Sequence, residues 1–425
     1  MSSKQFLQQV TSYIRSKEAR RYVEEELQHH LTESKNAWMN KGYSAKEAEE
    51  KAINEMGSAS QLGKSMDKIH KPKWDFWLLG GVILLLIASF IPILTTDLYQ
   101  DMTSYIIIRK LLHIVLATVS IAAIMYIDYR LLQKFSLYIY GIALFLLVIL
   151  LHMSNYVLQG EAMVQLGPLR LHAWMVLPLL LISFAGFFSE RKWKWWQLTS
   201  LSILPIFFFI QLPNLPVTLL YIAVIAVLFS FSYYSRKVKL LVFSVVGGIG
   251  IAVLAFGYHY ILMPYQKVRI AAFLHPERYA DSEGYIMVLF KNVLADSGWF
   301  GAETFAYIPD PHTNFALVQL IQSFGYVTGI AVILVILAIS LRILWITRTM
   351  PQSFGKLLVL AAVTLYSVQS IYSIFMVFGL LPIVGIPLPF ISYGMTPLLL
   401  NAILIGLVLS VYRRKSIMST KLVTD

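Results

Sequence analysis

The chain of 425 residues contains no cysteine, so neither disulfide bonds nor thiolate metal ligands contribute to its structure. Charged residues are also scarce: they make up 14% of the sequence, against about 25% in an ordinary soluble domain. Hydrophobic residues reach 57%. A composition this apolar lies outside the range of soluble proteins and is typical of a polytopic membrane protein.

The formal net charge is +12, which in a soluble protein would suggest nucleic-acid binding. Here the excess of Lys and Arg lies after residue 72, in short clusters between apolar segments, whereas residues 1–72 carry nearly balanced charge. Clusters of this kind are typical of membrane topology signals. We therefore expect no nucleic-acid partner.

Ten apolar segments follow from about residue 75, most of them close to the ~20 residues that cross a hydrocarbon core about 30 Å thick. Because lipid cannot satisfy free backbone groups, and β-barrel strands would be shorter and alternating, each segment is expected to be a helix. The predicted fold class is all-α, a polytopic membrane protein of about ten transmembrane helices with a small cytoplasmic helical N-terminal domain. The segments are 76–94, 105–126, 135–153, 172–188, 197–211, 216–234, 240–262, 318–346, 357–378 and 392–412.

The Lys and Arg residues between these segments predict the orientation of the chain. Basic residues recur in alternate connections, as in 190–194 and 413–415, whereas 95–104 and 211–216 contain none. By the positive-inside rule both termini are cytoplasmic. The long polar connection 263–317 is then extracellular, and its length favours a functional role over a simple connection.

Residues 1–72 are predicted to form a separate cytoplasmic prefix domain, ahead of a transmembrane domain at 75–415. Val23, Leu27 and Leu31 recur at helical spacing, which indicates one apolar stripe on a charged helix. Ser44-Ala-Lys-Glu47 is a capping-box start for the next helix. Through EEELQHHL and GYSAKEAEEKAINEMG the segment resembles helical prefix domains found ahead of some bacterial permeases.

Residues 308–315, IPDPHTNF, form the most unusual polar stretch of the extracellular loop. Asp310 stands between two prolines and His312 follows, with an intrinsic pKa suited to proton transfer. Lys267 and Arg269 begin the same loop. Mixed charges and turns suit an anionic, partly apolar ligand at the membrane face. A solvated loop, in which Asp310 only caps a turn, is the alternative.

Arg109 and Lys110 lie early in the second apolar segment, with His113 one turn later. A charge inside a membrane segment costs about 2.5–3.5 kcal/mol on insertion scales, so such residues usually face a cavity or an anion. The alternative is that their long side chains extend to the membrane interface.

The stretch GLLPIVGIPLPFISYGM at 379–395 contains three prolines and three glycines between two apolar segments, so it cannot continue a helix. Irregular backbone at membrane depth must line a cavity or be buried in protein.

This stretch resembles the signature of the SEDS family (shape, elongation, division and sporulation), whose members include FtsW, RodA and SpoVE. YQKVRIAAFLHPERYADSEGY at 265–285 and IDYRLLQKFSLYIY at 127–140 are similar to two further family segments. The resemblance covers roughly 75–415; Met395 departs from it, since a second glycine is usual there. The matching signature residues are Gly379, Pro382, Gly385, Pro387, Leu388, Pro389, Phe390, Ser392, Tyr393 and Gly394.

The resemblance implies a role in peptidoglycan synthesis at the bacterial plasma membrane. Family members polymerise glycan strands from lipid II, a polyprenyl-linked precursor, usually with a class B penicillin-binding protein. An aspartate of the large loop is taken as the base, and its position here is Asn314. Two glutamates usually follow it in the family, and their positions here are Gln322 and Ser323. An amide lacks useful basicity, so Asp310 and His312 are the candidate replacements. No cofactor is expected with certainty, and a divalent cation is left open. The residues expected to bind substrate are Arg109, Lys110, Lys267, Arg269, Pro389, Ser392 and Tyr393.

Three functions therefore stay open from the sequence. The first is an active glycosyltransferase whose base has moved. The second is a catalytically impaired relative that binds the precursor or a penicillin-binding protein as a regulator. The third is a transporter of the lipid-linked precursor, although a transporter would place broken helices nearer the middle of the membrane.

Overall fold

The computed structural model describes residues 2–95, 103–154, 156–158, 161–166, 169–212, 214–260, 264–350 and 353–415. The chain divides into two compact units. One comprises the N-terminal residues up to Asp75 together with residues from Val411 onward, and the other comprises Phe76–Ser410.

The N-terminal part of the first unit consists of four helices, α1 (Ser3–Ser12), α2 (Lys17–Asn40), α3 (Ala45–Met56) and α4 (Ala59–Ile69). The apolar stripe Val23, Leu27 and Leu31 is buried in its core, as the helical spacing predicts. The predicted capping box is present at the start of α3, where Ser44 and Glu47 satisfy each other's backbone N–H groups.

Glu49 joins three of these helices. Its carboxylate accepts hydrogen bonds from the backbone N–H of Ser3 (2.8 Å), the Ser3 hydroxyl (2.7 Å) and Lys35 Nζ (3.1 Å). These bonds to Ser3, with Lys35 adding to them, lower the pKa of the Glu49 carboxyl to about 2. The charged form therefore stabilises the docking of α1, and this contribution is lost as the pH falls from about 4.5 towards about 2.

Replacing Glu49 by Gln is expected to loosen α1 in the intact protein. A partly exposed hydrogen bond to a charged group contributes about 1 kcal/mol, so amide hydrogen exchange in residues 3–12 should become roughly fivefold faster at neutral pH. Glu50→Gln, which changes an exposed neighbour, serves as the control. Equal exchange in the two variants would contradict the role of Glu49.

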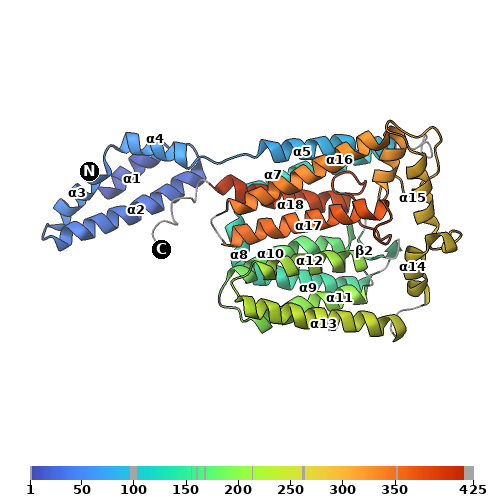
Figure 1. Ribbon diagram of the computed structural model, residues 1–425. Coiled ribbons are helices and arrows are strands. Elements are labelled where there is room, and N and C mark those ends of the chain that lie inside the picture. Colours follow the sequence, from blue (N-terminus) through green and yellow to red (C-terminus); the bar gives the residue numbers. More distant parts are fainter. Residues whose placement is uncertain are drawn as a thin grey trace. The chain divides into compact units, whose positions relative to one another are not determined.

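The second unit is a helical bundle, and each of the ten predicted segments contains a helix among its described residues (Figure 1). Six described helices are long and apolar enough to cross a membrane, by length and composition, and three shorter apolar helices accompany them. The bundle helices are α5 (Phe76–Ala88), α6 (Ile91–Leu94), α7 (Thr103–Tyr126), α8 (Tyr129–Lys134), α9 (Ser136–Met153), α10 (Leu177–Ser189), α11 (Trp195–Gln211), α12 (Leu215–Ser230), α13 (Arg236–Tyr260), α16 (Ala316–Arg348), α17 (Ser353–Val377) and α18 (Met395–Arg414).

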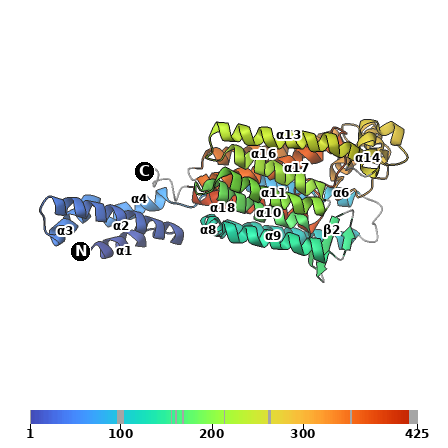
Figure 2. The ribbon, with the colours of Figure 1, turned by 90° about the horizontal axis from the view of Figure 1, so that it is seen from below.

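Helix α17 forms the centre of the bundle and α13 lies at its edge. Most residues of α17 are buried, and the helix packs against α10, α12 and α16. By contrast α13 exposes large apolar side chains along its length, among them Leu240, Val246 and Ile249. Both views show α13 as an outer helix (Figures 1 and 2).

A small antiparallel sheet lies between α9 and α10 in a fold that is otherwise helical, as the predicted all-α class requires. Its strands are β1 (Tyr156–Leu158), β2 (Glu161–Leu166) and β3 (Leu169–Leu171), in the order β1-β2-β3. Tyr156 pairs with Met163, and Val164 pairs with Leu171. Two turn signals in the sequence, Gly160 and Gly167-Pro168, separate these short segments, a hairpin pattern that the span prediction passed over.

The described part of the loop 263–317, which begins at Pro264, is folded rather than merely solvated. It contains α14 (Pro264–Leu274), the 3₁₀ turn η3 (Pro276–Tyr279) and α15 (Tyr285–Asp296). Two ion pairs tie these elements together, Arg269–Glu283 at 3.1 Å and Lys291–Glu277 at 2.6 Å. The loop ends in the polar stretch 308–315, directly before α16.

Candidate functional site

Three segments far apart in the sequence meet at Tyr393. Its backbone N–H donates to the carbonyl of His312 (2.7 Å), which joins the stretch 308–315 to the segment before α18. The Tyr393 ring lies edge-on to the His312 ring, with centroids 5.4 Å apart, and 5.6 Å from the ring of His113 on α7. The start of α7, the polar stretch and the proline-rich segment therefore form one cluster.

The proline-rich segment is buried in protein rather than lining a cavity along its whole length. Residues 386–392 are buried, and the Gln369 amide of α17 donates to the Pro387 carbonyl (2.8 Å). The Ser392 hydroxyl accepts from the Leu388 N–H at 2.8 Å. Pro389 and Ser392 thus shape the segment in this structure, and their direct contact with substrate stays a prediction.

Phe390 marks this segment as conformationally demanding. It has φ = 62°, in the left-handed region that bulky side chains rarely occupy. Its ring is buried beside Tyr366 of α17, with centroids 6.5 Å apart. Such a conformation costs about 1–3 kcal/mol and persists where surrounding packing imposes it. The turn that presents Tyr393 is therefore held in place by the bundle core.

Lys110 supports the same segment from α7. Its side chain is completely buried, with Nζ 3.5 Å from the Ile391 carbonyl and 3.4 Å from the Ser392 carbonyl. The interpretation that Lys110 extends to the membrane interface is therefore wrong. Arg109 is exposed at the neighbouring position, and its guanidinium lies 4.5 Å from the centre of the Tyr105 ring. Of the two cations, Arg109 is the one accessible to a ligand.

The stretch 308–315 is buried at both ends, whereas Asp310 between them is exposed. Ile308 and Phe315 are buried, the latter packed edge-on against Phe290 at 4.8 Å. Asp310 is exposed with φ = 47°, and its carbonyl accepts from the backbone N–H and hydroxyl of Thr313. The turn thus uses the backbone of Asp310 and leaves its carboxylate on the surface.

The His312 side chain is half-buried, near the Asp310 carboxylate and the Lys110 ammonium. Burial lowers the pKa of its imidazole below the ordinary 6.5; the Asp310 carboxylate opposes this shift and Lys110 adds to it. The ring is therefore neutral at neutral pH and able to accept a proton. Asp310 lies near enough to stabilise the protonated form electrostatically.

Asn314 lies beside the proline-rich segment at a second point. A Cβ added at Gly385 would be 3.6 Å from Asn314 Nδ2, so the amide occupies the space next to this glycine. Gln322 and Ser323 occupy the positions where the family resemblance places two glutamates. Gln322 is completely buried and donates to the Ala306 carbonyl (3.1 Å), and Ser323 Oγ accepts from the Gln319 amide (3.3 Å).

The remaining predicted residues lie on α14. Arg269 pairs with Glu283, and Lys267 is half-buried on the same helix. Their role in substrate binding stays a prediction. The sequence analysis noted His113 beside Arg109 and Lys110 but named neither Tyr105 nor Gln369 for the site. Within the described residues no group of three or more His, Asp or Glu side chains could hold a metal ion, and a divalent cation remains untested.

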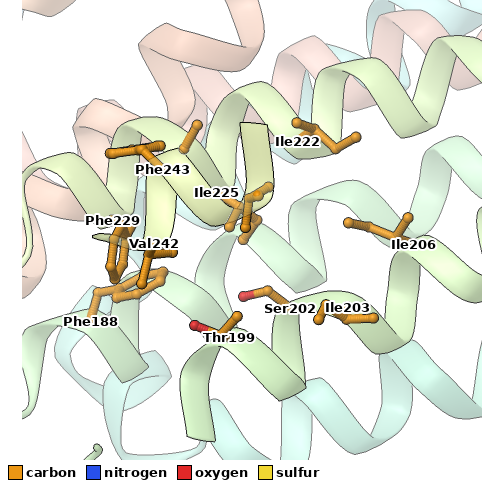
Figure 3. Close-up of a pocket in the computed structure, with 12 residues that line it drawn as sticks. Phe188, Thr199, Ser202, Ile203, Ile206, Ile222, Ile225, Phe229, Val242 and Phe243 are labelled. Carbon is orange, nitrogen blue, oxygen red and sulfur yellow. The ribbon is translucent and has the colours of Figure 1, made fainter. Parts of the chain in front are cut away.

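A separate apolar cavity of about 160 Å³ lies between α10, α11, α12 and α13 (Figure 3). It is lined near the C-terminal ends of α10 and α12 and the N-terminal ends of α11 and α13, for example by Phe188, Thr199 and Phe229. The cluster around Tyr393 lies before α18 and at the start of α7. The up-and-down order of the helices places these two features at opposite ends of the bundle.

Comparisons with known proteins agree with this arrangement. A family model described as "Cell cycle protein" (FtsW, RodA, SpoVE) matches residues 72–417. The probable peptidoglycan glycosyltransferase FtsW of Trichlorobacter lovleyi is 23% identical over 348 residues, covering 78% of this chain and 89% of that protein. Stage V sporulation protein E of Bacillus subtilis is 28% identical over 156 residues, which span 35% of this chain and 43% of that protein.

Two solved structures share the fold. A chain from a peptidoglycan synthase complex that coordinates polymerization and crosslinking has a TM-score of 0.68 at 19% identity, covering 80% of this chain and 98% of that one. The rod shape determining protein RodA of Thermus thermophilus has a TM-score of 0.59 at 18% identity, covering 80% and 97%. At these identities the likeness concerns the fold.

Proposed function

The chain belongs to the FtsW/RodA/SpoVE family of cell cycle proteins, and we propose that it polymerises peptidoglycan glycan strands from lipid II at the bacterial plasma membrane. The observation that supports this most is the joining of α7, the stretch 308–315 and the proline-rich segment around Tyr393. This cluster brings an exposed cation, an imidazole and an amide to the end of the bundle where the extracellular loop begins.

Arg109 suits the leaving group of such a reaction. Transfer breaks the bond between the donor sugar C1 and the lipid diphosphate, which departs as an anion. A guanidinium binds phosphate oxygens in a bidentate manner and remains charged at any physiological pH. Lys110, buried one residue away, adds positive potential in a region of low dielectric. Positioned cations of this kind stabilise the charge that develops in the transition state.

His312 suits the base. As the acceptor hydroxyl forms its new bond to C1, its proton passes to the neutral imidazole, and the exposed Asp310 carboxylate stabilises the resulting cation. Asn314, half-buried beside Gly385, orients the acceptor hydroxyl through its amide. Asp310 therefore takes a positioning role in this proposal, and His312 accepts the proton.

By the positive-inside rule, the basic connections support cytoplasmic termini and an outward-facing cluster. The partner proposed for this chain is a class B penicillin-binding protein, which would crosslink the strands made here. The match to a chain of a peptidoglycan synthase complex supports this choice. Such pairing would locate the protein in cell division, elongation or sporulation.

One observation favours a second function, regulation without catalysis. Asn314 stands where the family resemblance places the catalytic aspartate, and both following glutamate positions hold neutral residues. A chain of this kind would bind lipid II or a synthase without polymerising. Transport of the precursor has less support, because the broken segment contacts α7 and α17 within one half of each helix, at Lys110 and Gln369, rather than interrupting a helix at its middle.

Polymerisation of lipid II by the purified full-length protein, alone and with a class B penicillin-binding protein, tests the proposal. Glycan strands are expected, and Arg109→Gln should reduce their rate by roughly tenfold to a hundredfold, because the departing diphosphate loses its accessible cation. Arg278→Gln, which removes an exposed arginine of the loop 263–317 away from α7, is the control. Absence of strands under every pairing, with lipid II binding retained, would establish the regulatory function instead.

A further inference from the structure

The cavity between α10, α11, α12 and α13 is lined mainly by apolar side chains, which suit a hydrocarbon ligand. Ten of its twelve lining side chains are apolar, and the other two are Thr199 and Ser202. The Thr199 hydroxyl donates to the Trp195 carbonyl (2.9 Å) and the Ser202 hydroxyl to the Leu198 carbonyl (2.7 Å). Both hydroxyls are thus satisfied within α11, so the cavity offers little to water. Ile203 and Val246 of the lining are exposed, so the cavity opens on the apolar surface of the bundle and is accessible to a hydrocarbon chain.

Aromatic rings close the end of the cavity nearest the basic connections (Figure 3). Phe229 lies between Phe188 and Phe243, with ring centroids 6.0 Å and 5.6 Å away. The hydroxyls of Tyr233 and Tyr234 both donate to the Trp193 carbonyl. These bonds join the connection after α12 (231–235) to the connection after α10 (190–194). The charged side chains in and beside these two connections therefore lie at the same edge of the cavity, which we call the rim.

The rim is strongly basic. Lys192 pairs with Glu190, and Lys239 Nζ donates to the carbonyls of Ser230 and Ser232. The other cations of the rim are exposed, and they are Arg191, Lys194, Arg236 and Lys237. Four exposed cations beside an apolar cavity match a ligand that has an anionic head and a hydrocarbon chain.

We propose that this cavity binds one acyl chain of an anionic glycerophospholipid, whose phosphate rests on the exposed cations of the rim. The acyl chain would fill the space beside the loosely packed helix α13, and so hold α13 against α11 and α12. Lipid II is a poorer occupant, because the proposed polymerisation site lies at the other end of the bundle. The exclusion of lipid II rests on the proposed function, whereas the apolar lining and the exposed cations do not.

Lipid retention by the full-length protein tests the apolar half of the site. The purified protein is incubated with equal amounts of phosphatidylglycerol and phosphatidylcholine of the same chain length, and bound lipid is counted by native mass spectrometry. Ala226→Trp places an indole in the cavity and is expected to abolish preferential retention of phosphatidylglycerol. Ile87→Trp, on the exposed face of α5, should leave it unchanged.

Charge removal tests the other half without altering the core. Arg236→Gln combined with Lys237→Gln is expected to reduce phosphatidylglycerol retention at least roughly fivefold, since each cation near an anionic surface contributes about a factor of five. Lys134→Gln, a basic residue of another connection, is the control. Equal retention of the two lipids, retention that either cavity or rim variant leaves unchanged, or preferential retention of a polyprenyl phosphate would overturn the proposal.

Discussion

Asn314→Asp is expected to raise the rate of lipid II polymerisation by roughly a hundredfold. The substitution places a carboxylate at the position where the family resemblance locates the base. General-base catalysis contributes about 10²–10⁴-fold, so a base at this position can add up to roughly a hundredfold to the contribution of His312. The surroundings already suit it, since the side chain is half-buried beside Gly385, at the end of the bundle that carries Arg109 and Lys110. The measurement is the initial rate of strand formation with purified protein.

Two comparisons sharpen this result. Asn292→Asp adds the same charge to an exposed residue of α15 in the same loop, and it should leave the rate unchanged. In the Asn314→Asp background, loss of His312 should cost much less than in the unmodified chain, because two bases would serve one proton. A rate unaffected by Asn314→Asp would mean that the pocket as a whole no longer fits the transition state.

His312→Asn is expected to reduce polymerisation by roughly a hundredfold or more, since an amide cannot accept the proton. Because burial lowers the pKa of the imidazole, the unmodified protein should keep a constant rate above pH 6.5 and lose activity as the pH falls through the lowered pKa. The same shift makes the folded state less stable at acid pH, since the unfolded chain takes up this proton more readily. Rates measured as a function of pH for both proteins give the loss of rate in His312→Asn and the pH at which the unmodified protein loses activity.

His275 and Asp310 provide the controls for this assignment. His275 is exposed in the same loop, so His275→Asn should change neither the rate nor its pH dependence. Asp310→Asn removes the carboxylate that stabilises the protonated imidazole, so the acid limb should move to lower pH with a smaller loss of rate. An acid limb retained in His312→Asn would exclude His312 as the base.

The helices could be predicted from hydrophobic length alone, because each must bury about 20 apolar residues in lipid. The sheet β1-β2-β3 could not, because strands of three to six residues carry little periodicity. The residues of the candidate site could likewise be predicted from the sequence only in part. A sequence motif located the proline-rich segment and Asp310, His312 and Asn314 beside it. The partner of Lys110 was out of reach, because its carbonyl contacts lie more than 280 residues away in sequence.

The burial of Ser392 shows a second limit. A hydroxyl in a polar, proline-rich segment reads as a ligand contact in sequence, yet in the fold it accepts from the Leu388 N–H and closes the turn. Tyr393, one residue later, is the side chain that reaches His312 and His113. The positive φ of Phe390 and the packing of the segment against α17 determine whether Ser392 or Tyr393 faces the cluster. Neither feature can be read from the local sequence.

Photo-crosslinking of lipid II to the full-length protein tests the proposed site most directly, and it does not require turnover. A lipid II analogue with a photoreactive group beside its diphosphate is bound, irradiated and mapped by mass spectrometry. Crosslinks are expected in residues 103–113 and 308–315, and Arg109→Gln should weaken both. Labelling confined to α11, α12 and α13, with none in those two segments, would contradict the account.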